Sequence, residues 1–418
     1  MSTKNRVDAV LMAVVLAAAA AGCSAATERA ATSRISAEST GGLAGAPDLP
    51  APASSATSSA SASASYQVIP IDSLPFPEPG RSPLSAARQQ ALQAAVNRAI
   101  ADPAASGVQG VTAAVVSPEG SWAGAAGVDG AATQLTPTSM IDIASITKTV
   151  TAAEVLHLAG AGLIDLDAPA SDYLDHPLLQ RHPTVRQLLS HTSGVPHFDA
   201  DPAFFAAKDA DPHRHWTAAE VLAFATGPIN DPGGTVLDYC NSNYLLLGLL
   251  IEKITGLTYA EAVHRDVLAG LGDRMVVQDA ESPILPLAVP DPASGTAFDG
   301  QYLPNRSTSS AVGSAGGIAA DAPTLANWGY RLYGGQVLPP AVTVDMAIPV
   351  SQGYGLGTVI FDPLVVGHDG SMEAYTTMLA VAPRDRLSMA IMFVNTGADA
   401  RPDFHQLVDD IRATLAIQ

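Results

Sequence analysis

Three short groups of residues in this chain carry side chains that can do chemistry together. The first group is Ser145 and Lys148, which stand at the start of a stretch with helical periodicity. Residues three apart on a helix share one face, so the Lys148 amine could reach the Ser145 hydroxyl. A serine alcohol becomes a good nucleophile when a base takes its proton, and a buried, partly neutral lysine can act in this way. The same spacing also fits an exposed, capped first turn of a helix, so the pair alone does not establish a catalytic role.

The second group is Tyr239 and Asn241, which precede the continuous apolar run Leu245 to Ile251. That run predicts a buried helix, closed near Gly256. If both side chains enter one cleft, the phenol could relay a proton and the amide could hydrogen-bond a substrate carbonyl. A half-buried tyrosine followed by a helix-capping asparagine is the alternative interpretation.

The third group is His368, Gly370 and Ser371, just ahead of a predicted strand that begins at Tyr375. Gly370 would let a substrate backbone lie close along a strand edge. The Ser371 amide, together with the Ser145 amide, would stabilise an oxyanion. His368 could donate to a leaving group or a carboxylate. Taken alone, the group also fits an ordinary loop turn.

The elements that must position these groups follow from the pattern of apolar residues. Helical periodicity begins at Ser85 and returns in a final helix that starts at Pro402 and Asp403. Strand patterns occupy 111–116, 121–128, 375–382 and 386–394, and the middle of the chain, 145–270, is mostly helical. This distribution predicts one sheet built from both ends of the chain, with a helical insert.

Taken together and in this order, the three groups resemble the serine β-lactamase and penicillin-binding family. The resemblance is to the branch of class C β-lactamases, D-alanyl-D-alanine carboxypeptidases and related esterases, and it extends from about Leu84 to Ala416. It implies an α/β (α+β) fold in which an antiparallel sheet, flanked by N- and C-terminal helices, stands beside a mostly helical domain. The site would lie in the seam. Further stretches match the family: Leu188 to Gly194, Pro232 to Thr235, Ser314 to Ile318 and Tyr354 to Gly357.

The resemblance also implies a role for each residue. Ser145 would be the nucleophile, Lys148 its proton partner, and Tyr239 the general base or proton relay. Asn241 would bind the acyl-side amide, and His368 stands where β-lactamases usually have lysine. Whether Lys148 or Tyr239 takes the first proton stays open. The reaction would need no metal or other cofactor.

Some positions depart from the family pattern. Cys240 replaces the commoner serine or alanine, and its side chain is expected to pack. Ala374 stands where glycine is common, and His368 removes a fixed positive charge from the carboxylate-binding side. The expected activity is that of a D-alanyl-D-alanine carboxypeptidase or β-lactamase, with a small-molecule or peptidoglycan-peptide substrate. Two alternatives are an esterase or amidase on other small substrates, and a penicillin-binding or sensing lipoprotein without turnover.

The pattern of residues at the N-terminus predicts an export signal. Lys4 and Arg6 precede the apolar stretch Ala9 to Ala21, which is too short for a permanent spanning helix. The following residues resemble a bacterial lipobox, which implies cleavage before Cys23 and lipidation of its sulfur. An ordinary secretory signal is the alternative.

The resulting organisation has three parts. Residues 1–22 are a lipoprotein signal peptide, residues 23–81 a lipidated cysteine and a disordered tether rich in Ala, Ser and Pro, and residues 82–418 the hydrolase domain. The protein is expected to be exported and held to the extracytoplasmic face of the cell membrane by its lipid.

Composition excludes other classes of protein. The formal charge of −19 argues against nucleic acid as a partner, and two cysteines cannot form a disulfide scaffold. With 47% hydrophobic residues, the chain can bury a large core. His213 and His215 suggest metal ligation, but a solvated loop fits them better.

Overall fold

The computed structural model describes residues 68–101, 107–278, 287–289, 306–395 and 404–415. The predicted signal peptide, Cys23 and the tether as far as residue 67 lie outside these ranges, as do Pro402 and Asp403. Within them, no helix combines the length and the apolar character that crossing a membrane requires.

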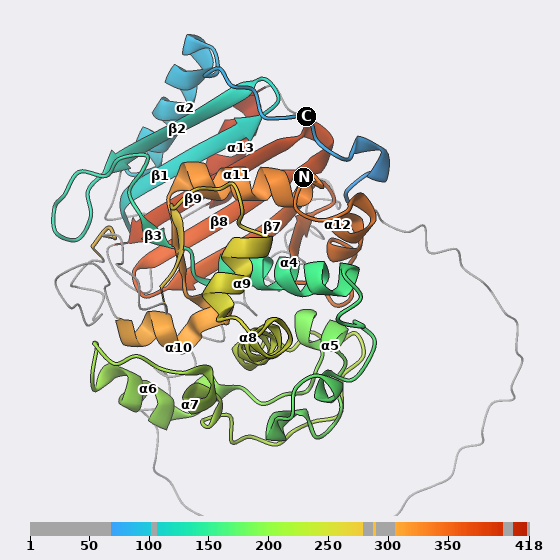
Figure 1. The fold of residues 1–418 in the computed structure, drawn as a ribbon. Coiled ribbons are helices and arrows are strands. Elements are labelled where there is room, and N and C mark those ends of the chain that lie inside the picture. Colours follow the sequence, from blue (N-terminus) through green and yellow to red (C-terminus); the bar gives the residue numbers. More distant parts are fainter. Residues whose placement is uncertain (1–67, 102–106, 279–286, 290–305, 396–403, 416–418) are drawn as a thin grey trace, which may run out of the picture.

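One antiparallel sheet joins the two ends of the chain (Figure 1). Its order is β2-β1-β9-β8-β7-β6, and the pairing of β1 with β9, which joins the two chain ends, sets Val111 opposite Phe393. The strands are β1 Val108–Ser117, β2 Gly120–Gly127, β6 Val359–Asp362, β7 Val365–Met372, β8 Tyr375–Ala382 and β9 Leu387–Asn395. The predicted sheet from both chain ends is therefore confirmed.

Both faces of this sheet are covered by helices, because its central strands are apolar on both sides. In β9, Met389, Ile391 and Phe393 belong to the core beneath α2 (Ala86–Ala99) and α13 (Phe404–Thr414). The alternate residues of β9 face the other core, which includes α11 (Ala322–Tyr333). Because successive side chains of a strand point to opposite faces of the sheet, neighbouring residues of β9 pack in different cores.

The helical part lies against one end of the sheet (Figure 1). At its centre is α8, whose run Leu245 to Ile251 is almost wholly buried and which ends at Gly256 in the left-handed conformation (φ 69°). The helices here are α4 Thr147–Gly160, α5 Val185–Leu189, α6 Pro202–Asp209, α7 Ala218–Leu222, α8 Asn241–Thr255, α9 Tyr259–Asp266 and α10 Arg306–Gly316. Helix α12, Pro340–Met346, packs beside α11 and the segment Ile71–Ser73. The predicted α/β (α+β) class, with an antiparallel sheet, terminal helices and a helical domain, is confirmed.

Short elements connect these layers. A small sheet has the order β3-β5-β4, with β3 Ile141–Asp142, β4 Met275–Val277 and β5 Ile318–Ala320. The 3-10 helices are η1 Ile71–Ser73, η2 Ala144–Ile146, η3 Ala170–Asp172, η4 Pro177–Leu179, η5 Phe198–Ala200 and η7 Pro383–Asp385. Of these, η2 leads directly into α4, and η5 lies in the connection between α5 and α6.

The packed part of the chain begins before the predicted boundary at residue 82. Val68, Ile69 and Phe76 are buried in the main core. The Phe76 ring meets that of Tyr330 edge-on at 5.2 Å between centroids, and the Phe76 amide donates to the Gly334 carbonyl (2.8 Å). Residues 68–81, which the sequence analysis assigned to the tether, therefore pack against α11 and the residues that follow it.

We predict that Phe76→Ala lowers the free energy of unfolding by about 3–5 kcal/mol, because it removes a buried aromatic ring and leaves a cavity. Urea unfolding measures the change. Ile71→Ala is the matched control, since Ile71 is 46% exposed in the same segment and its truncation should cost far less. Equal, small effects of the two substitutions would show that the segment does not stabilise the domain.

Candidate active site

Ser145 and Lys148 meet where η2 leads into α4. Lys148 Nζ lies 3.1 Å from Ser145 Oγ and donates to the Ala315 carbonyl at 2.8 Å. The Lys148 side chain has no exposure to solvent, whereas Ser145 is partly accessible. The expected contact between residues i and i+3 is thus present, with an amine held directly behind an accessible hydroxyl.

The backbone before Ser145 is held in an uncommon conformation. Ala144 has φ +48°, a region that residues with a side chain rarely adopt. Its amide donates to Asp142 Oδ1 (2.9 Å), and the carbonyl of Ile143 accepts from Thr377 Oγ1 (3.0 Å). These two bonds tie the approach to Ser145 to β3 and β8, which fixes the direction of the serine side chain.

Asp142 is a positioning residue that the sequence analysis missed. It is buried, and Gln278 Nε2 donates to its second oxygen at 2.9 Å. Burial raises the pKa of Asp142 to about 8 despite these hydrogen bonds. An acidic residue three positions before the serine was the available signal, but only the fold shows that it holds the Ala144 amide.

Gly370 lies where β7 passes closest to this segment. A Cβ on Gly370 would stand 2.3 Å from the Ile143 carbonyl oxygen and 3.1 Å from Ala144 Cβ. This glycine was predicted to make room for a substrate backbone. In the structure, the missing side chain makes room for the protein's own segment just before Ser145.

Ser371 stands on a free stretch of the β7 edge. Strand β6 pairs with β7 only as far as Gly367, so from His368 to Met372 the described partner is β8 alone. Met372 and Tyr375 flank a two-residue turn and form a hydrogen-bonded pair. Hydrogen-bonded and non-hydrogen-bonded pairs alternate along an antiparallel ladder, so the next pair, Ser371 and Thr376, is not hydrogen-bonded. The Ser371 amide is accordingly directed away from β8, toward the open edge.

Tyr239 packs beside Lys148. The lysine Nζ lies 4.9 Å from the centroid of the Tyr239 ring, and the His191 ring lies 4.3 Å from the same ring between centroids. The Tyr239 hydroxyl is buried. The structure therefore brings the predicted alcohol, amine and phenol together, from η2, α4 and the segment before α8.

His368 is buried and does not face the cavity beside Ser145. Its Nδ1 donates to the Asp369 carbonyl (2.6 Å), and the Tyr354 hydroxyl donates to Nε2 (3.0 Å). Burial, helped by the charge of Lys148, lowers the pKa of His368 to about 3, so the ring is neutral. This position corrects the expectation that His368 contacts a substrate carboxylate, because both ring nitrogens are already used inside the protein.

A cavity of about 180 Å³ lies beside Ser145. Ser145, Asn241 and Ser371 line it, so the candidate nucleophile and two predicted substrate-binding residues share one space. Asn241 Nδ2 donates to Asp199 Oδ2 (2.8 Å), and Asp199 lines the same cavity, so a carboxylate joins the predicted residues there.

Two neighbouring residues have structural positions. The Cys240 thiol packs against the Val195 carbonyl (3.4 Å), and burial raises the pKa of Cys240 to about 12. The Cys240 amide donates to His191 Nδ1 (3.0 Å), which connects the segment before α8 to the end of α5. Among the described residues, no group of three His, Cys, Asp or Glu side chains is arranged to hold a metal ion.

Comparison of sequences places most of the chain in one group of proteins. The family model Beta-lactamase matches residues 96–410. Penicillin-binding protein 4 of Amycolatopsis lactamdurans is 30% identical over 148 residues, 34% of this chain and 37% of that protein. The matched region spans only about a quarter to two fifths of the length of the curated relatives.

Solved structures resemble the chain over a greater length. A D-stereospecific amidohydrolase from Streptomyces sp. is 28% identical with a TM-score of 0.60, covering 77% of this chain and 97% of that one. D-amino acid amidase from Ochrobactrum anthropi, complexed with L-phenylalanine amide, is 23% identical with a TM-score of 0.66, covering 79% and 98%. The similarity to D-amino acid amidase shows a shared fold.

We predict that Gly370→Ala slows covalent labelling of Ser145 by a fluorophosphonate by roughly tenfold or more, because the added Cβ displaces the segment at Ile143 and Ala144. Mass spectrometry of the labelled protein measures the rate. Gly160→Ala at the end of α4 is the control, since its Cβ would meet nothing within 4 Å. Unchanged labelling in both variants would contradict the tight fit at Gly370.

Proposed function

The chain belongs to the beta-lactamase family, and from this premise we propose that it acts on amide or ester bonds through an acyl-enzyme at Ser145. The observation that carries the proposal is the 3.1 Å contact between Lys148 Nζ and Ser145 Oγ at the wall of a cavity. Nucleophile and base within hydrogen-bond reach are the arrangement that covalent catalysis by serine requires.

The chain's own residues can carry each step. Lys148 or Tyr239 takes the Ser145 proton while Ser145 Oγ forms a bond with the substrate carbonyl carbon. The resulting oxyanion lies between the Ser145 and Ser371 amides. The proton then passes to the leaving amine or alcohol as its bond to carbon breaks. Water attacks the ester of Ser145 in the same manner and releases the acid.

Among such hydrolases, we favour an amidase or esterase of small substrates over a D-alanyl-D-alanine carboxypeptidase or a β-lactamase. Those two act on substrates with a carboxylate, for which a fixed cation is useful. His368 is neutral and buried, and Lys208, the basic residue that lines the cavity, is paired with Asp209. The likeness to a D-stereospecific amidohydrolase supports the same choice.

We predict that Ser145→Ala abolishes both acylation and turnover of a short p-nitrophenyl ester, because the attacking oxygen is gone. Lys148→Met should cost several kcal/mol of transition-state stabilisation while circular dichroism stays unchanged. Ser121→Ala, an exposed serine on β2, is the control and should react as the parent does.

The same assay compares substrate classes. A small amide and the ester should be hydrolysed faster than a chromogenic cephalosporin or a D-alanyl-D-alanine peptide. Persistent labelling of Ser145→Ala would reject the nucleophile. A stable penicillin adduct without turnover of any substrate would favour a binding or sensing protein instead.

We further propose that the protein is exported and held to the outer face of the membrane by a lipid on Cys23. The support is the lipobox-like sequence that ends in this cysteine. Cys23→Ser should move the protein from the membrane fraction to the medium or periplasm, as judged by fractionation and by the mass of the mature N-terminus. A parent protein that lacks lipid on Cys23 would contradict this proposal.

A further inference from the structure

Asp199 is a nearly buried carboxylate in the wall of the catalytic cavity. Its side chain is 9% exposed, and it lines the same cavity as Ser145. Oδ2 accepts from Asn241 Nδ2, whereas Oδ1 makes no hydrogen bond with the residues that the structure describes. A carboxylate removed from water in this way gains most from a charged donor that approaches through the cavity.

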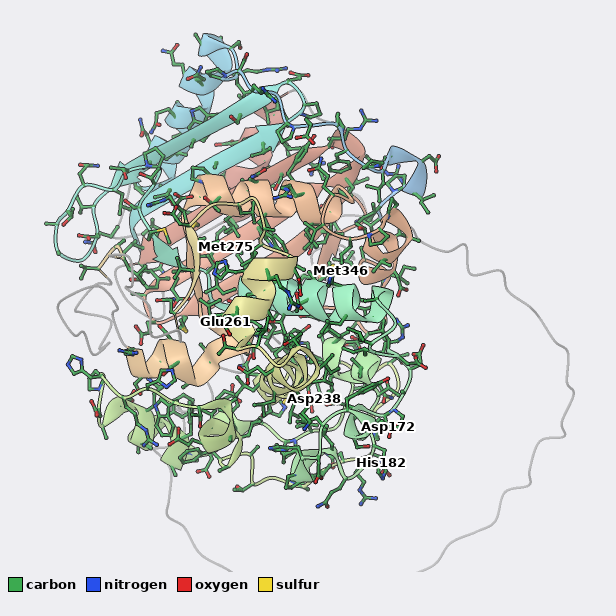
Figure 2. The ribbon with its side chains drawn as sticks, in the orientation of Figure 1. Asp172, His182, Asp238, Glu261, Met275 and Met346 are labelled. Atoms are coloured by element: carbon green, nitrogen blue, oxygen red, sulfur yellow. The ribbon has the colours of Figure 1, made fainter. Side chains whose placement is uncertain are left out.

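His197 lies between Asp199 and a second carboxylate. His197 Nδ1 is 3.9 Å from Asp199 Oδ1, while its Nε2 lies 2.9 Å from Asp238 Oδ1. The hydrogen bond to Asp238 is the main cause of the raised pKa of His197. Because the close contact of this one imidazole is to Asp238, it does not compensate Asp199. Figure 2 shows Asp238 among the helices, on the side away from the sheet.

The other charged residues of the cavity also favour a cation. Glu373, in the turn after β7, lines it as a second acid. Lys208 also lines it, but its amine is engaged by Asp209 and by Thr308 Oγ1 (3.0 Å). Lys148 stands behind Ser145 and donates to the Ala315 carbonyl. The cavity therefore favours a cation and disfavours a carboxylate.

The rest of the wall is apolar. Phe198, Phe204 and Phe205 form a continuous aromatic surface, with edge-on ring contacts at 4.9 Å and 5.2 Å between centroids. Val312 and Met372 also line the cavity. At about 180 Å³ the space is small beside the roughly 300–1,000 Å³ of typical ligand pockets, which suits one amino-acid side chain better than a peptide.

We propose that Asp199 binds the protonated amine of the acyl group, so that the substrates are amides or esters of single apolar amino acids with an unblocked amine. The inference rests on the proposed function, because it assumes that the carbonyl carbon of this amino acid is the one that Ser145 attacks. It adds the chemical class of the acyl group and the residue that selects it.

The test is a matched pair of substrates, phenylalanine p-nitroanilide and its N-acetyl derivative, in both enantiomers. At pH 6 we expect kcat/KM for the preferred unblocked enantiomer to exceed that of its N-acetyl partner by at least about tenfold. The preference should fall as the pH rises through about 8, where an α-amine loses its proton.

Three variants assign the preference to one carboxylate. Asp199→Asn should lower the ratio of unblocked to N-acetyl kcat/KM by about tenfold or more, and Asp199→Glu should retain part of it. Asp231→Asn removes the same charge from an 84% exposed side chain outside the cavity and should leave the ratio as in the parent.

Binding without turnover separates this inference from the proposed function. Ser145→Ala, titrated calorimetrically with phenylalanine amide and with N-acetylphenylalanine amide, should bind only the unblocked compound, and adding Asp199→Asn should remove that binding. Equal binding or equal cleavage of the two compounds would overturn the amine site, even if Ser145 is acylated. Selective binding of phenylalanine amide by a protein that never acylates would uphold the amine site and reject the hydrolase.

Discussion

The burial of the Lys148 amine is the constraint on which the site depends. An amine taken completely out of water is costly unless polar partners and well-packed side chains surround it. Here they are Ser145 Oγ, the Ala315 carbonyl and the ring of Tyr239, which come from η2, the end of α10 and the segment before α8. The contacts that make the lysine tolerable inside the protein are thus the contacts that assemble the reactive centre.

The parts of the site that could be predicted from sequence are those set by local geometry or by recognisable motifs. Ser145 and Lys148 are one helical turn apart, so their contact needs only the start of α4. Tyr239 and Asn241 come just before the apolar run that predicts the buried helix α8. The order of the three groups then indicated the family, and the strand patterns at both chain ends predicted the sheet independently of it.

The parts that could not be predicted depend on packing between distant segments. His368 and Gly370 belong to strand β7, although Gly367-His368-Asp369-Gly370 has little intrinsic strand propensity and suggested a loop. Pairing with β8 overrides that preference. Burial among Tyr354 and Tyr239 then decides that His368 is neutral. Likewise, residues 68–81 show no helical or strand periodicity that would predict the contact of Phe76 with the ring of Tyr330.

Two features of charge act in the same direction at the cavity. His368, which stands where the family resemblance implies a lysine, is neutral and offers a carboxylate no cation, and the nearly buried carboxylate of Asp199 opposes a carboxylate further. Each feature alone would only weaken one class of substrate. Since Asp199 is also held in place by Asn241, the residue expected to bind the acyl group, its carboxylate offers a cation a defined position. In the proposed reaction, the electrostatics of the cavity select the acyl group, while the Ser145–Lys148 pair carries out the chemistry.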